Sequence, residues 1–109
     1  MEKVTEKNMT ENKDNLIIEL KSPVHFEEKS YEKIDLTGLR DIKAADMVEI
    51  NRRLSRNGNV DSTQEVTLEY ALNLANTATG LPLEFFNQLP PYAAMAVRRC
   101  VVGFLYNPE

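Results

Sequence analysis

The hydrophobic pattern of this chain begins with two short segments in which apolar and polar residues alternate. The apolar face of the first segment consists of Leu16, Ile18 and Leu20. Its charged face consists of Glu19 and Lys21. The second segment has the same period of two around Ile34 and Leu36. Ser22-Pro23 interrupts the first segment and a polar stretch at residues 27–30 precedes the second, which predicts an antiparallel hairpin with one buried face. Because a hairpin alone is marginal in water, that face must pack on helices.

Three longer segments have the period of amphipathic helices. The first follows residues 41–43 and ends near Arg56, before Asn57-Gly58. The second opens with a capping box from Ser62 to Glu65. It is apolar around most of its circumference, which predicts the central helix, and its narrow polar wedge is Glu65, Glu69, Asn73 and Asn76. The third runs from about Pro91 to Tyr106, and Pro82 begins a short helical turn before it.

Together these segments predict an α+β fold, in which an N-terminal antiparallel β-hairpin packs on a small bundle of three main α-helices plus a short helical turn. Residues 1–14 alternate charges of both signs without an apolar period, so we expect a disordered charged leader there. Residues 15–109 then form a single domain, which is the usual number for a chain of 109 residues.

Charge and hydropathy narrow the classes of partner. The formal net charge is −4, so no general positive field attracts phosphate backbones, and we expect no nucleic acid partner. No stretch approaches the roughly 20 apolar residues that span a bilayer, and the N-terminus lacks the apolar region of a secretion signal, so we expect no membrane association. The single cysteine, Cys100, suits a reducing cytoplasm.

The residue types that carry chemistry are isolated from one another. His25 is the only histidine, lies in an expected loop, and has no further ligand or nucleophile at a recognised spacing. Cys100 lies in an apolar run, where it is typical of a small buried hydrophobic residue. The four glycines form no phosphate-binding loop. We therefore predict no enzyme, no cofactor and no metal site.

Arginines on the first helix raise the possibility of DNA binding. Arg52, Arg53 and Arg56 share one side of this helix, and a short connection to the next helix resembles a helix-turn-helix. Glu49 lies three and four residues before Arg52 and Arg53, which favours a solvated face of ion pairs.

The last helix has more apolar surface than one-sided packing requires. One face suits the core: Ala93, Ala96, Val97, Cys100, Val101 and Phe104. A second stripe consists of Tyr92, Met95, Arg99, Val102 and Tyr106, and Met, Tyr and Arg are enriched where proteins meet. Either a protein partner or the hairpin of the same chain covers this stripe.

Phe85 and Phe86 pose a similar choice, because adjacent residues on a helical turn point about 100° apart. We expect that one of them anchors the core and that the other contacts a partner. The predicted partner-binding residues are therefore Phe85, Phe86, Tyr92, Met95, Arg99, Val102 and Tyr106.

The order of several short motifs resembles the tail assembly chaperone family of long-tailed bacteriophages and prophages. These motifs are a strand with Lys21-Ser22-Pro23-Val24, a return strand from Tyr31 to Leu39, Ala45-Asp46-Met47, and residues 74–89 around Thr79-Gly80-Leu81-Pro82. The chain departs from the family at Glu27-Glu28, where a glycine is frequent, and at Pro90-Pro91, where an acidic residue is frequent.

The resemblance implies a non-catalytic role in the host cytoplasm. A protein of this family would bind the phage tape measure protein and keep it soluble before the tail tube polymerises, and would act as a homo-oligomer. Two alternatives stay open, namely another virion assembly module, such as a head-tail connector component, and a small DNA-binding regulator.

Overall fold

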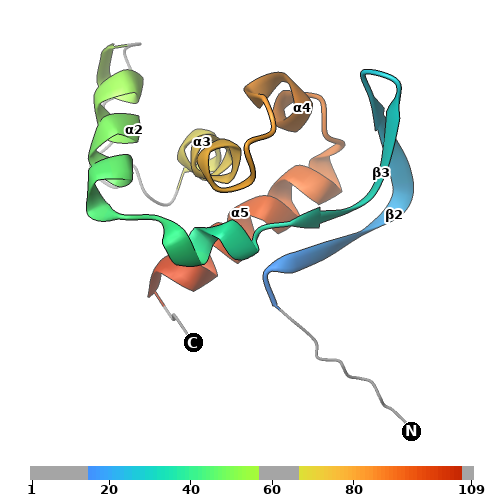
Figure 1. Cartoon of the computed structure of the whole chain (residues 1–109), viewed down its shortest axis with the longest axis horizontal. Helices are drawn as coiled ribbons and strands as arrows, with labels where there is room; N and C mark the ends of the chain where they lie inside the picture. The colour runs from blue at the N-terminus through green and yellow to red at the C-terminus, as the bar shows by residue number, and fades with distance from the viewer. Residues whose placement is uncertain (1–14, 57–66, 107–109) are drawn as a thin grey trace, which may run out of the picture.

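An antiparallel hairpin is followed by four α-helices in the computed structural model, which describes residues 15–56 and 67–106 (Figure 1). The elements are β2 (Ile17–Phe26), β3 (Lys29–Asp35), the 3₁₀ helix η1 (Thr37–Asp41), α2 (Ala44–Arg56), α3 (Leu68–Thr79), α4 (Leu83–Asn87) and α5 (Pro91–Tyr106). The predicted α+β class, with a hairpin, three main helices and a short helical turn, is confirmed. The expected leader at residues 1–14 lies outside the described residues.

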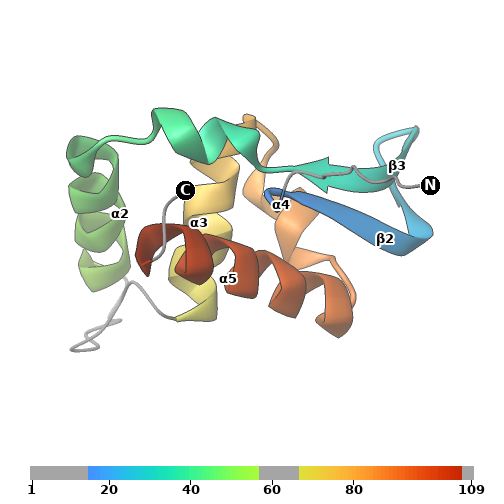
Figure 2. The ribbon, with the colours of Figure 1, turned by 90° about the horizontal axis from the view of Figure 1, so that it is seen from below.

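Helix α3 is the centre of the molecule. It contacts α2, η1, α4 and α5, while α2 and the hairpin lie at opposite ends (Figures 1 and 2). Tyr70 and Leu74 of α3 are fully buried, as a helix that is apolar around most of its surface requires. Asn73 is also buried, contrary to the expected polar wedge, because its Nδ2 donates a hydrogen bond to the Glu69 carbonyl oxygen.

The hairpin is longer than its apolar alternation predicted. Only Glu27 and Glu28 form the turn, and both have positive φ angles, of 50° and 67°. Ser22-Pro23 lies inside β2 and does not end it, because the strand register shifts between Glu19 and Val24. Proline has no N–H to donate, and it is tolerated where a bulge leaves the ladder unpaired.

The return strand is shorter than the Tyr31–Leu39 segment of the resemblance. It ends at Asp35, whose carboxylate accepts hydrogen bonds from the Thr37 backbone N–H at 2.9 Å and from the Thr37 hydroxyl at 2.6 Å. This local turn leads into η1. Gly38 of η1 packs so closely on α3 that an added Cβ would overlap the Ala78 carbonyl oxygen.

The helix boundaries follow local signals. Thr67 caps α3 by accepting a hydrogen bond from the Tyr70 N–H, and Gly80 ends this helix with a φ of 80°. Helix α3 therefore begins later than the capping box Ser62 to Glu65 predicted, and that box lies outside the described residues. The predicted bounds of α2 and α5 are confirmed, and the predicted helical turn near Pro82 is α4, which begins at Leu83 after the N-cap Pro82.

Candidate functional site

The predicted stripe on α5 lies opposite the buried side of the helix. Successive residues of a helix are about 100° apart, which places the stripe across the helix from the core residues Ala93, Ala94, Val97 and Val101. Met95 is 40% exposed and Tyr106 is 56% exposed. Arg99 is exposed and Val102 is half-buried. We call these residues, together with Tyr92, the α5 stripe.

The hairpin holds the first residue of the α5 stripe. The hydroxyl oxygen of Tyr92 accepts a hydrogen bond of 2.9 Å from the Lys21 backbone N–H, and the Lys21 ammonium lies 5.2 Å from the centre of the ring. Lys21 belongs to the part of β2 where the register shifts. The hydrogen bond from β2 to α5 therefore lies at the irregularity in the strand. Tyr92 is nevertheless 36% exposed, and the rest of the stripe extends away from this contact.

Phe85 and Phe86 are both buried, so the expectation that only one of them enters the core is wrong. Their rings meet edge to face with 5.1 Å between centroids. Phe85 also packs against two hairpin rings, with centroids 4.8 Å from Tyr31 and 5.6 Å from Phe26. The hairpin therefore covers the side of α4 that the sequence left open, and neither phenylalanine is presented at the surface.

Two grooves flank α5. The first, the β2–α5 groove, has a volume of about 460 Å³ and lies between α5 and the start of β2. Its apolar lining includes Leu16, Ile18, Ala96, Cys100 and Phe104. The second groove, of about 380 Å³, lies between α5, α3 and α4 and is lined by Leu68, Phe86, Ala94 and Met95. Each groove meets one stripe residue, Arg99 in the first and Met95 in the second.

The isolated chemistry-bearing residues take structural positions. His25 lies in β2 and not in the expected loop, and its carbonyl oxygen accepts a hydrogen bond of 3.0 Å from Gln88 Nε2. Cys100 is half-buried, and its thiol donates to the Asn15 carbonyl oxygen at 3.5 Å. Within residues 15–56 and 67–106, no three His, Cys, Asp or Glu side chains gather as metal ligands would.

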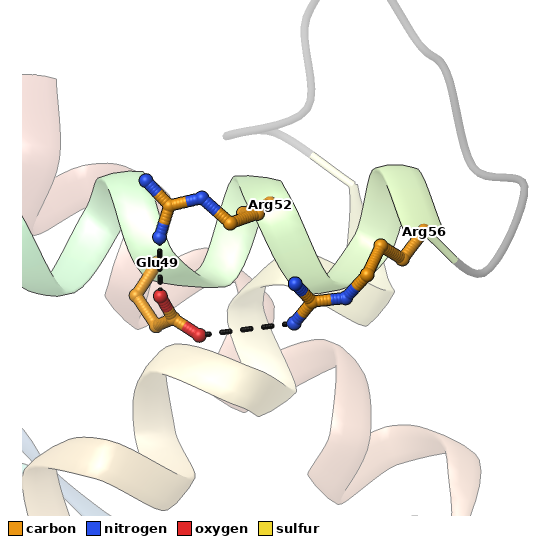
Figure 3. A network of polar contacts seen from close by, with 3 residues as sticks. All are labelled: Glu49, Arg52 and Arg56. Atoms are coloured by element: carbon orange, nitrogen blue, oxygen red, sulfur yellow. Dashed lines mark hydrogen bonds and ion pairs between the residues drawn. The ribbon is translucent and has the colours of Figure 1, made fainter.

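The arginines of α2 form an ion-pair network on its surface. Figure 3 shows Arg52 and Arg56 both directed at Glu49, and the Arg56 Nη2 lies 3.9 Å from the carboxylate. Arg53 is half-buried and does not share this exposed side. The Glu49–Arg52 pair is the one that the i, i+3 spacing predicted, whereas the described residues show no ion pair between Glu49 and Arg53.

Sequence reasoning did not assign Leu68 or Gly103 to a surface groove. Leu68 is 38% exposed although it starts the central helix, and Gly103 is a helical glycine beside the β2–α5 groove. Helix α3 has apolar residues around most of its circumference, and this pattern could have indicated that one of them, such as Leu68, is exposed. Nothing in the local sequence distinguishes Gly103, because its setting depends on a strand start more than 80 residues earlier.

The fold and the α5 stripe define a small α+β module with an exposed, partly apolar helix surface. A family model described as "Phage tail assembly chaperone proteins, E, or 41 or 14" matches residues 17–106. The chain belongs to this family, which confirms the resemblance found in its sequence, and it has a role in phage tail assembly with protein partners. Comparisons with curated proteins and with solved structures find no match. None of the helices that the structure describes is long and apolar enough to cross a membrane.

Proposed function

We propose that this chaperone binds the tape measure protein of its phage and keeps it soluble until the tail tube polymerises around it. In this proposal the protein acts in the host cytoplasm as a homo-oligomer, and its role is binding without catalysis. Membership of the tail assembly chaperone family supports the general role. The observation that carries the specific proposal is the α5 stripe, which exposes tyrosine, methionine and arginine on one helix face.

The stripe has the composition of a contact surface. Tyrosine and arginine are the residue types that most often dominate binding energies, and methionine adapts its shape to different partners. Tyr106, at 56% exposure, and Met95, at 40%, leave large apolar side chains in water until a partner covers them. Phe85 and Phe86 are not part of the proposed surface, because both are buried in the core.

Co-expression with the tape measure protein tests the proposal. We expect the two proteins to co-purify and the tape measure protein to remain soluble only when this chain is present. The proposal fails if the tape measure protein is equally soluble alone and no complex is recovered.

Substitutions on the stripe connect this result to α5. Arg99→Glu combined with Tyr106→Ala should abolish tape measure or self-binding while the circular dichroism spectrum stays unchanged. The control is Lys33→Glu combined with Val48→Ala, which reverses an exposed charge and removes an exposed apolar side chain elsewhere on the molecule. If the stripe variant unfolds, these side chains belong to the core and the proposed surface is wrong.

A further inference from the structure

We propose that the β2–α5 groove binds a segment of the protein partner in which a carboxylate is flanked by apolar side chains, with the carboxylate paired to Arg99. This inference rests on the proposed function, because the partner is the protein that the chaperone keeps soluble. It adds the chemistry by which a particular part of the partner is recognised.

The size of the groove and the apolar part of its lining suit apolar side chains, while Asn15 and Arg99 supply polar groups. Its volume of about 460 Å³ is in the range of sites that enclose a small ligand or several side chains. Leu16 and Ile18 line one wall, and Ala96 and Phe104 of α5 line the other. Leu16 is itself buried in the core, so this wall of the groove is fixed.

Arg99 determines the charge of the occupant. It is the one charged residue among the residues lining the groove. It forms no hydrogen bond or ion pair with any residue in the described parts of the chain. A guanidinium group binds a carboxylate through two parallel hydrogen bonds, and apolar surroundings strengthen that pairing. A segment with an acidic residue is therefore complementary to this groove, and a basic segment is repelled.

The hairpin limits the length of the occupant. Farther along β2, the Tyr92 hydroxyl oxygen accepts a hydrogen bond from the Lys21 N–H, and the Gln88 side-chain amide donates one to the His25 carbonyl oxygen. Side chains from the α4–α5 corner thus occupy this part of the strand, and the groove lies beside the first residues of β2. The groove therefore fits a short segment and not a strand added along the whole of β2.

Gly103 provides a way to close the groove without disturbing the fold. It lines the groove, and a Cβ built at this position meets no heavy atom within 4 Å. Gly103→Leu should place its side chain in the space that the partner segment would occupy. Gly103→Ala is the matched control, because a single methyl group leaves most of the groove open.

The affinity of the chaperone variants for the tape measure protein is the first test. We expect Gly103→Leu to weaken binding by about tenfold or more and Gly103→Ala to bind like the wild type. Each variant is checked by its unfolding transition, so that a loss of binding is not a loss of folding. If Gly103→Leu is folded and binds as well as the wild type, the groove is not the binding site, although the proposed function stands. If the wild type itself recovers no tape measure protein, the proposed function and this inference both fall.

Cross-linking identifies the occupant. A photo-reactive benzoylphenylalanine replaces Phe104 in the groove, and the same residue replaces Val48 on α2 as the control. We expect position 104, and not position 48, to cross-link a tape measure segment with an Asp or Glu among apolar residues. Changing that acidic residue to Arg should restore binding to the Arg99→Glu chaperone. Cross-links to residues 1–14 of the same chain, to a second copy of it, or to a segment without an acidic residue would overturn the inference.

Discussion

Two glycines show how the same residue type can be required at one position and dispensable at another. Gly38→Ala places a methyl group against the Ala78 carbonyl of α3, and backbone cannot move aside without shifting η1. We expect this variant to lose about 1–3 kcal/mol of unfolding free energy. Gly103→Ala meets open space in an exposed part of α5 and should gain up to about 1 kcal/mol, since alanine favours helices. Urea unfolding of both variants measures the difference, and equal effects would contradict the close packing at Gly38.

Asp35 gives the junction of β3 and η1 a dependence on pH. Hydrogen bonds from the Thr37 hydroxyl and then from its backbone N–H lower the pKa of Asp35 from its ordinary value of 3.8. The pKa of Asp35 is lower in the folded state than in the unfolded state. The contribution of its charged form to the free energy of unfolding is therefore fully present above about pH 4, and it is lost as the pH falls through the folded-state pKa. Thr37→Val should raise the pKa of Asp35 and reduce stability slightly at pH 7, with a smaller difference from the wild type near pH 3. NMR titration of Asp35 checks the pKa, and an unchanged value would show that the hydroxyl does not matter.

The sequence predicts the burial or exposure of a residue correctly where helix periodicity determines it, and incorrectly where contact with a distant element determines it. The exposure of Arg99 and Tyr106 follows from their position on the helix wheel. The burial of Phe85 does not, because it depends on hairpin rings contributed by Phe26 and Tyr31, and Phe86 is buried next to Phe85. A local pattern contains no information about a neighbour more than 50 residues away in the sequence.

At the scale of elements, the hairpin turn carries a conformational cost. Glu27 and Glu28 both have positive φ angles, which a two-residue turn of this kind requires and which Asn-Gly adopts more easily. Replacing the pair by Glu27→Asn and Glu28→Gly should raise the free energy of unfolding by about 1 kcal/mol. Glu27→Gln with Glu28→Gln removes the charges but keeps the side chains, and should not stabilise. If the glutamine variant stabilises equally, charge repulsion and not backbone conformation limits the turn.

Apart from the start of α3, helix ends were easier to predict than strand ends because local residues mark them. Gly80 marks the C-terminal end of α3, Pro82 precedes the first residue of α4, and Pro91 is the first residue of α5. The strands have no such marks. The local sequence at Pro23 predicts a strand end, because the register shift that accommodates this proline is a property of the paired strands.

At the scale of the whole molecule, the stripe was predictable and the grooves beside it were not. The stripe belongs to one helix, so its period is visible in consecutive sequence. The β2–α5 groove brings Leu16 and Ile18 next to Phe104, and only the docking of the hairpin on the corner of α4 and α5 places these residues together. A surface assembled from the two ends of a chain requires the fold before it can be recognised.

The proposed binding of the tape measure protein leads to a last prediction, which concerns the number of chaperone copies in the complex. The described residues form a body with its longest dimension near 50 Å, so a proposed partner longer than this leaves room for several copies. Several copies that also contact one another would gain avidity from each additional site. We expect light scattering of the purified complex to give a mass of more than one chaperone per tape measure protein. The Arg99→Glu, Tyr106→Ala variant should form no complex, or one with fewer copies if only self-binding is lost. The Lys33→Glu, Val48→Ala control should keep the wild-type mass. A complex of one copy each, unchanged by the stripe variant, would contradict both the coating arrangement and the role of α5 in it.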